Sequence, residues 1–265
     1  MRRLRLPSAI LVFLSASFFS CSPIGPDGRL SAPNAAAPPI DQLILSSNAC
    51  GPAALLYSFS AGSEPWRRVS DAVPGKTDRE RLVYVMKRYA LQPSRHFRNQ
   101  RRWSKRGGIG AADLADMAAD MAAAGGKLSA IRSESLIDTR GDPAALLRRL
   151  HKRLSGSLRR GLPPILAVKR MAKPKNGGPA SWAVVEGHYL VVTSLPGRLR
   201  RGATSFGIDC VDPNGGKRRH AMIRLSPDPA APWLAIDCPG TPVGRRRLHS
   251  GQISHVTPSA VIGKF

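Results

Sequence analysis

The sequence predicts an α+β fold, with helices in the first half of the domain and an antiparallel sheet in the second. Apolar residues recur at helical spacing over residues 78–91 and 111–124, and Met117 and Met121 fall on the buried face of the second helix. By contrast, residues 180–195 are rich in β-branched and aromatic side chains, which is typical of strands. Helices and strands that are segregated along the chain favour an α+β layout.

The chain has 265 residues, which is enough for one domain with a substantial core. Residues 1–21 are interpreted as an export signal, because a basic N-terminus precedes an apolar stretch over residues 9–19 and then Ser20–Cys21. Residues 22–40, rich in proline and alanine, are interpreted as a flexible linker. Residues 41–265 then form a single folded domain, and the protein is predicted to be exported.

Cys21 raises the question of lipid anchoring. A small residue before this cysteine fits a bacterial lipoprotein box, but Phe18 and Phe19 stand where leucine and a small residue are expected. Lipid anchoring at Cys21 and simple export to the periplasm or the medium both remain open.

One cysteine stands where a helix is about to begin, in the run Asn48-Ala-Cys-Gly-Pro-Ala53. Pro52 suits a first helical turn, and the apolar run 53–59 supplies a buried helical face. At a helix N-terminus, unpaired N–H groups and the helix dipole favour an anionic sulfur over a neutral thiol. Cys50 is therefore a candidate nucleophile; the alternative is a small residue buried beneath the helix.

Two more elements are predicted before the strands of the main sheet. Asp142-Pro143 forms a cap, followed by a helix to about Ser155. Residues 161–168 are predicted to form a short buried strand. Residues 169–179 are interpreted as a polar loop before the histidine strand, which is either a mobile surface loop or a border of the cleft that could contact substrate.

The predicted sheet contains two candidate partners for Cys50. His188 is placed at the start of a strand over Tyr189–Thr193, and Asp212 at the end of the next strand, before a Pro-Asn-Gly-Gly turn. If the strands pair as a hairpin, Asp212 can reach His188. Such a histidine takes the thiol proton and later gives it to the leaving group, while the carboxylate fixes the imidazole tautomer. Asp209 competes for the acid position, but its odd spacing from Asp212 puts it on the opposite strand face.

Three motifs occur in order along the chain: Asn48-x-Cys50-Gly51-Pro52-Ala53, Gly187-His188-Tyr189-x-Val191-Val192 and Asp212-Pro213-x-x-Gly216. This order resembles the bacteriocin-processing (double-glycine) peptidase family and its relatives of papain-like fold, over roughly residues 41–225. The resemblance implies a papain-like α+β fold, in which N-terminal helices pack on a C-terminal antiparallel sheet. It also implies that Cys50 is the nucleophile, His188 the general base and Asp212 the residue that orients the histidine.

The same family implies an oxyanion-hole donor, a glutamine that lies several residues before the cysteine. Gln42 is the upstream candidate, and it stands eight residues before Cys50, a slightly longer gap than the family pattern. Either a longer loop still delivers Gln42 to the site, or Asn48 serves instead.

Cys210 and Cys238 could form one disulfide in an oxidising compartment, which would leave Cys50 as the free thiol of the mature domain. If Cys50 paired with either of them, it could not act as a nucleophile. None of the six histidines shows a paired ligand spacing such as His-x-x-x-His, so no metal site and no cofactor are predicted.

The formal net charge is +24. Such a charge attracts anionic envelope polymers or a membrane surface, although an arginine-rich composition alone would also produce it. No nucleic-acid motif accompanies the charge, and an export signal argues against a specific nucleic-acid partner. The basic clusters lie at residues 67–68, 98–106, 148–160, 198–201, 217–219 and 245–247.

The predicted function is that of an exported cysteine peptidase, which hydrolyses peptide bonds through a Cys/His/Asp triad and a thioester acyl-enzyme. A cell-wall amidase or a transglutaminase-like acyl transferase would use the same residues. A third interpretation is a non-catalytic, basic, envelope-binding protein in which Cys50 is buried or disulfide-bonded. The sequence does not identify the peptide or protein substrate.

Overall fold

The computed structural model describes residues 27–46, 48–126, 130–137, 142–176, 181–228, 231, 234–243 and 247–265. The predicted export signal, Cys21 and residues 22–26 lie outside these ranges. No helix in the described ranges is long and apolar enough to cross a membrane.

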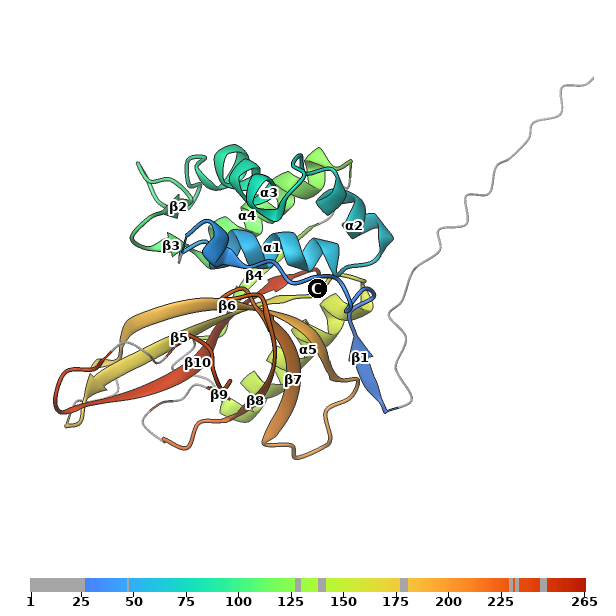
Figure 1. Ribbon diagram of the computed structural model, residues 1–265. Coiled ribbons are helices and arrows are strands. Elements are labelled where there is room, and N and C mark those ends of the chain that lie inside the picture. Colours follow the sequence, from blue (N-terminus) through green and yellow to red (C-terminus); the bar gives the residue numbers. More distant parts are fainter. Residues whose placement is uncertain are drawn as a thin grey trace, which may run out of the picture.

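Helices pack on both faces of a curved antiparallel sheet, and the α+β prediction is confirmed (Figure 1). Four helices gather on one side of the sheet: α1 (Cys50–Ser60), α2 (Glu64–Asp71), α3 (Asp78–Val85) and α4 (Ala111–Ala124). A π-helical turn, η2 (Met86–Ala90), continues α3. The fifth helix, α5 (Pro143–Arg159), packs on the other face of the strands.

The main sheet has the strand order β4-β10-β5-β6-β7-β8-β9, and every neighbouring pair is antiparallel. A short strand, β1, pairs with β6, while β2 and β3 form a separate hairpin. The strands are β1 (Arg29–Ser31), β2 (Trp103–Ser104), β3 (Gly108–Ile109), β4 (Arg132–Ser135), β5 (Ile165–Pro174), β6 (Ala183–Pro196), β7 (Ser205–Asp212), β8 (Lys217–Leu225), β9 (Leu234–Asp237) and β10 (Gln252–Gly263).

Two hydrophobic cores lie on the two faces of the sheet. Alternation along β6 divides its side chains: Tyr189 and Val191 join the core beneath α1 to α4, whereas Leu190 and Val192 join the core against α5. The run 53–59 of α1 is buried, as predicted. Met117 and Met121 are buried in the same core, which confirms their assignment.

Three expectations about element boundaries need correction. Strand β6 begins at Ala183, so His188 lies within the strand rather than at its start. Strand β5 extends to Pro174, so the first part of the segment interpreted as a polar loop is paired β-structure; residues 177–180 lie outside the described ranges. The described part of the segment interpreted as a linker is folded too, because β1 pairs with β6 and its Leu30 side chain is fully buried.

The cap predicted for α5 is present. Both carboxylate oxygens of Asp142 accept backbone hydrogen bonds, from Ala144 N at 2.9 Å and from Ala145 N at 3.0 Å. These bonds satisfy two of the amide groups that a helix start leaves without intrahelical partners. The helix continues to Arg159, one turn beyond the predicted end, because Leu158 is still buried against the sheet.

Substituting Asp142→Ala should lower the free energy of unfolding by about 1 kcal/mol, since both capping bonds are lost. Asp142→Asn is the matched control, because its side-chain oxygen can still accept a hydrogen bond from the helix start. Urea denaturation measures both variants. An equal loss in the two would mean that the negative charge of Asp142, and not its capping bonds, stabilises α5.

Candidate active site

His188 and Asp212 meet because β6 and β7 are antiparallel neighbours, with Val191 opposite Val211. The predicted hairpin is therefore confirmed. Nε2 of His188 lies 2.7 Å from Oδ1 of Asp212, and both side chains are buried. Asp212 is the last residue of β7, as predicted, and the next residues form the expected turn.

Cys50 is the first residue of α1, and this helix packs on β6. The helix start brings the thiol group of Cys50 into hydrogen-bonding contact with the imidazole of His188. Because Nε2 of His188 faces Asp212, Nδ1 is the ring nitrogen left for the sulfur. The three predicted triad residues thus form one chain of contacts, in the order Cys50, His188, Asp212.

The surroundings of His188 favour its charged form. Burial by itself lowers the pKa of His188, but the hydrogen bonds to Asp212 and Cys50 and the charges of both partners outweigh it, raising the pKa to about 9. At neutral pH the ring is therefore an imidazolium. A cation beside the sulfur is the arrangement that favours a thiolate.

Asp212 is fully buried and charged, and its carboxylate has three donors. Oδ1 accepts from His188 and from the backbone N of Asn214 at 2.8 Å, while Oδ2 accepts from Nε of Arg219 at 3.1 Å. Burial raises the pKa of Asp212, but these bonds and the His188 charge lower it by more, so its pKa lies below the usual range. The carboxylate is therefore ionised, and its orientation is fixed.

Arg219 is a site residue that the sequence analysis missed. Beyond its bond to Asp212, its guanidinium donates to the carbonyls of Pro239 at 3.1 Å and Gly240 at 2.6 Å. Gly240 has a φ of +80°, and a Cβ there would collide with the Arg219 side chain. In the sequence, Arg219 belongs to the basic cluster at residues 217–219. A signal was present, because a hairpin closed at 213–216 puts Lys217 opposite Asp212 and residue 219 on the same face.

The hydrogen bonds of Gln42 and Asn48 distinguish between these two candidates for the oxyanion donor. Gln42 is buried and lines the same cavity as Cys50 and His188. Its backbone N donates to the carbonyl of Pro213, in the turn after Asp212, so the longer loop does deliver it to the site. The amide nitrogen of Asn48 instead donates to the carbonyl of Lys105 at 2.6 Å. That bond leaves Gln42 as the better-placed donor.

The β2–β3 hairpin forms one wall of the site and is bound to the triad elements. Nε1 of Trp103 donates to the carbonyl of Asn48 at 2.8 Å, just before the nucleophile. The hydroxyl of Tyr189, next to His188, donates to the carbonyl of Ile109 at 2.8 Å. Burial raises the pKa of Tyr189, so this hydroxyl remains protonated as a donor. The hairpin is thus held from both the helix side and the sheet side.

A cavity of about 860 Å³ opens beside these residues. Gln42, Cys50 and His188 line it, whereas Asp212 lies behind His188 and is fully buried. Much of the remaining wall consists of glycine, alanine and serine from the β2–β3 hairpin, the start of α4 and strands β4, β5, β6 and β10. Small side chains leave room for a ligand backbone to approach the sulfur closely.

Asp209 takes no part in this chain. Its carboxylate pairs with Arg29 at 2.9 Å and with Nδ1 of His220 at 3.0 Å, on the opposite strand face. The choice of Asp212 over Asp209 as the partner of His188 is therefore confirmed by the geometry.

Cys210 and Cys238 are both free thiols in this structure and contact each other. Cys210 donates to Cys238, which raises the pKa of Cys210 and lowers that of Cys238. Cys50 is also a free thiol and pairs with neither. The Cys210–Cys238 disulfide stays a prediction.

One group of potential metal ligands occurs among the described residues: His96, Asp113 and Asp116, with ligand atoms within 4.8 Å of one another. Side chains of the protein already lie beside both of its carboxylates. Ser94 donates to both carboxylate oxygens of Asp113, and Asp116 lies 3.3 Å from His96 and 3.8 Å from Arg95. A guanidinium at this distance opposes a second cation, so we interpret the group as an ion-pair network.

His188 should make stability depend on pH between 6.5 and 9. Its folded-state pKa of about 9 exceeds the ordinary 6.5, so its contribution is fully present below pH 6.5 and is lost as pH rises through 9. In His188→Gln this part of the decline should vanish. Urea denaturation of both proteins at several pH values between 6 and 9.5 measures it, and parallel declines would contradict the assigned imidazolium.

Replacing Arg219 should destabilise the protein in a pH-dependent way. Arg219→Gln removes a donor to a buried carboxylate, so the free energy of unfolding should fall by about 1.5–3 kcal/mol at pH 7. The pKa of Asp212 should rise toward its ordinary value. Because a lowered pKa stabilises only above the unfolded-state value, the difference from the parent should shrink as pH falls below about 4.

Arg218→Gln is the matched control for this experiment. Arg218 is the neighbouring residue and also donates to two carbonyls, those of Ala35 and Ala37, but it does not contact Asp212. Its replacement should cost about 1 kcal/mol at all pH values. Acid-side denaturation curves that shift equally in both variants would show that Arg219 does not act through Asp212.

Comparison of the chain with protein-family models, with curated proteins and with solved structures finds no match. The resemblance to double-glycine peptidases therefore stays a prediction, and the functional assignment depends on the residues and the geometry described above.

Proposed function

We propose that this protein is an exported cysteine peptidase with a papain-like catalytic arrangement. The observation that carries the proposal is the contact chain Cys50–His188–Asp212 at the edge of a cavity of about 860 Å³. A buried carboxylate orients an imidazolium, and the imidazolium contacts a thiol at a helix N-terminus. These are the elements that nucleophilic catalysis by cysteine requires. The basic and apolar N-terminal segment of the sequence supports export.

In the proposed reaction, the Cys50 sulfur attacks the carbonyl carbon of the scissile amide. Protonated His188 gives its Nδ1 proton to the leaving nitrogen, so the C–N bond breaks and a thioester remains on Cys50. Neutral His188 then takes a proton from water, which attacks the thioester and releases the acid product. Asp212 holds the ring through Nε2 in both steps, because this bond does not involve the reacting nitrogen.

In both tetrahedral intermediates the former carbonyl oxygen carries a negative charge, which hydrogen-bond donors stabilise. The backbone N–H of Cys50 is among the first amides of α1, which have no intrahelical partners. Together with the side-chain amide of Gln42, it would form an oxyanion hole. The docking of Gln42 on the turn after Asp212 supports this role, since the donor is then held in place before the substrate arrives.

Alkylation of Cys50 by iodoacetamide is the first test. At pH 6 an ordinary cysteine, with a pKa of about 8.5, is almost wholly protonated and reacts slowly. We expect Cys50 to react readily at pH 6, and His188→Ala to slow this reaction by about tenfold or more. Peptide mass mapping separates Cys50 from Cys210 and Cys238. Equal rates in the two proteins would argue against a Cys50–His188 pair.

Hydrolysis is then measured on a mixed peptide library and on muropeptides, with products identified by mass spectrometry. Peptide products that disappear in Cys50→Ala would support the peptidase. Cleavage of muropeptides alone would point to an amidase, and transfer to an added amine to an acyl transferase. An unreactive Cys50 without any product would favour the envelope-binding protein.

A further inference from the structure

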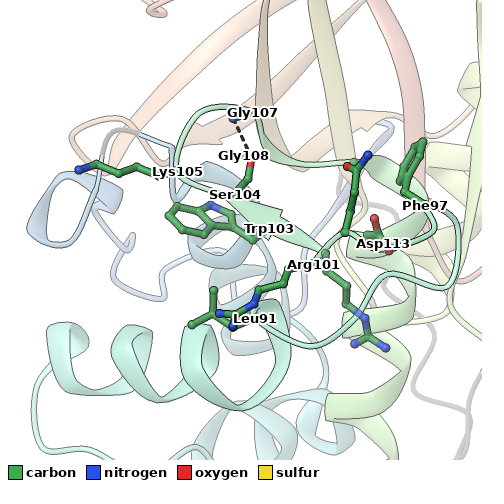
Figure 2. A pocket seen from close by; sticks show the side chains of 12 residues that line it. Leu91, Phe97, Arg101, Trp103, Ser104, Lys105, Gly107, Gly108 and Asp113 are labelled. Carbon is green, nitrogen blue, oxygen red and sulfur yellow. Dashed lines mark hydrogen bonds between the residues drawn. The ribbon is translucent and has the colours of Figure 1, made fainter.

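A second cavity, of about 560 Å³, lies next to the first (Figure 2). The two share three lining residues, Gly107, Gly108 and Gly110, so only the β2–β3 hairpin and the residues after it separate them. Figure 2 shows Trp103 and Ser104 of β2 on one side of the second cavity, and Phe97 and Asp113 on the other. Phe97 is about half exposed although it is a large apolar side chain.

The hairpin between the cavities is fixed relative to the nucleophile. Its bonds from Trp103 to Asn48 and from Tyr189 to Ile109 join it to the residues that flank Cys50 and His188. Both cavities therefore keep a constant position with respect to the triad. A ligand that extends over the hairpin would contact both.

The lining of the two cavities contains more cations than acidic groups. Arg101 and Lys105 line the second cavity, and Arg106 and Lys169 line the first. Within the described part of the chain, no acidic group lies within ion-pair distance of these four side chains. Lys169 is opposite Gly187 in the β5–β6 pair, one residue from His188.

The acidic residues of the lining are already matched by protein donors. Asp113 accepts two hydrogen bonds from Ser94, and Glu186 lies 3.7 Å from Arg170. A further cation, Arg102, lines the second cavity with 4 % of its surface exposed. Its Nη1 pairs with Asp120 at 2.7 Å, but its Nε has no hydrogen-bond partner in the described ranges.

Building on the proposed function, we propose that the two cavities form one substrate cleft that selects peptide segments with acidic side chains. Cations on both sides of the hairpin would face carboxylates along an extended peptide, whose residues advance by about 3.3 Å each. Arg101, Lys105 and Arg106 are exposed and Lys169 is half-buried, so these side chains are accessible to a ligand and their attraction to it is screened by salt. Acidic peptides are thus the substrate class that the cleft fits.

Binding is tested with the full folded domain carrying Cys50→Ala. This variant lacks the proposed nucleophile and therefore does not hydrolyse the peptide. The probes are three fluorescein-labelled decapeptides that are identical except for Asp, Asn or Lys at every third position. Fluorescence anisotropy should give the Asp peptide an affinity about tenfold above that of the Asn peptide, and the Lys peptide the lowest affinity. The preference should weaken when salt is raised from 50 to 500 mM, values at which screening differs strongly.

Two charge-reversal pairs separate the cleft from the total charge. Arg101→Glu with Lys105→Glu should abolish or invert the preference for the Asp peptide. Arg200→Glu with Arg201→Glu changes the net charge equally at an exposed turn that lines neither cavity, and it should leave the preference in place. In proteins with an intact Cys50, the first pair should raise KM for acidic substrates and leave kcat nearly unchanged.

Equal affinity for the three peptides would overturn the inference, and so would equal losses in the two charge-reversal pairs, because the attraction would then belong to the whole basic surface. Neither result would touch the peptidase proposal, which depends on Cys50 reactivity and on hydrolysis. Conversely, selective binding of the Asp peptide by a protein that cleaves no peptide would support the proposed cleft and contradict the proposed peptidase activity.

Discussion

Asp212 is a carboxylate that is fully buried, and three donors from three parts of the chain compensate its charge. His188 comes from β6, Asn214 from the turn that follows β7, and Arg219 from β8. A buried ion without such partners would be protonated or would destabilise the fold. The need to compensate this one charge therefore fixes the relative positions of two strands and a turn, and through His188 it fixes the geometry around Cys50.

The turn after Asp212 connects this carboxylate to the opposite side of the cavity. Its Pro213 carbonyl accepts the backbone N–H of Gln42, and Oδ1 of Asp41 accepts from Gly215 at 2.9 Å. These two hydrogen bonds hold residues 41 and 42 against the turn. As a result, the acid that orients the histidine and the proposed oxyanion donor are joined through one turn, although they are far apart in the sequence.

Local signals predicted α1, α3, α4 and α5, though not α2, and the pairing of β6 with β7, because capping residues, apolar periodicity and turn sequences act over a few residues. They left Arg219 unassigned, because the alternation that separates it from Arg218 has a meaning only once β8 is paired with β7; Arg218, on the other face, holds the N-terminal segment instead. They also misjudged residues 29–31, whose polar and proline-rich surroundings hid the pairing of Leu30 with β6. Long-range contacts determined both cases. The choice between Gln42 and Asn48 likewise needed the position of the β2–β3 hairpin.

The pairing of β1 with β6 has a geometric consequence for the whole molecule. Strand β1 lies opposite Ser194–Pro196, at the far end of β6 from His188, a separation of about 20 Å along the strand. In Figure 1, β1 lies at the right edge of the molecule, below the C-terminal end of α1 and away from its start. Anything attached ahead of residue 27, a fusion tag or a surface linkage, is therefore joined to the domain remote from the cleft. The protein could be immobilised by its N-terminus with its cleft still facing the solution.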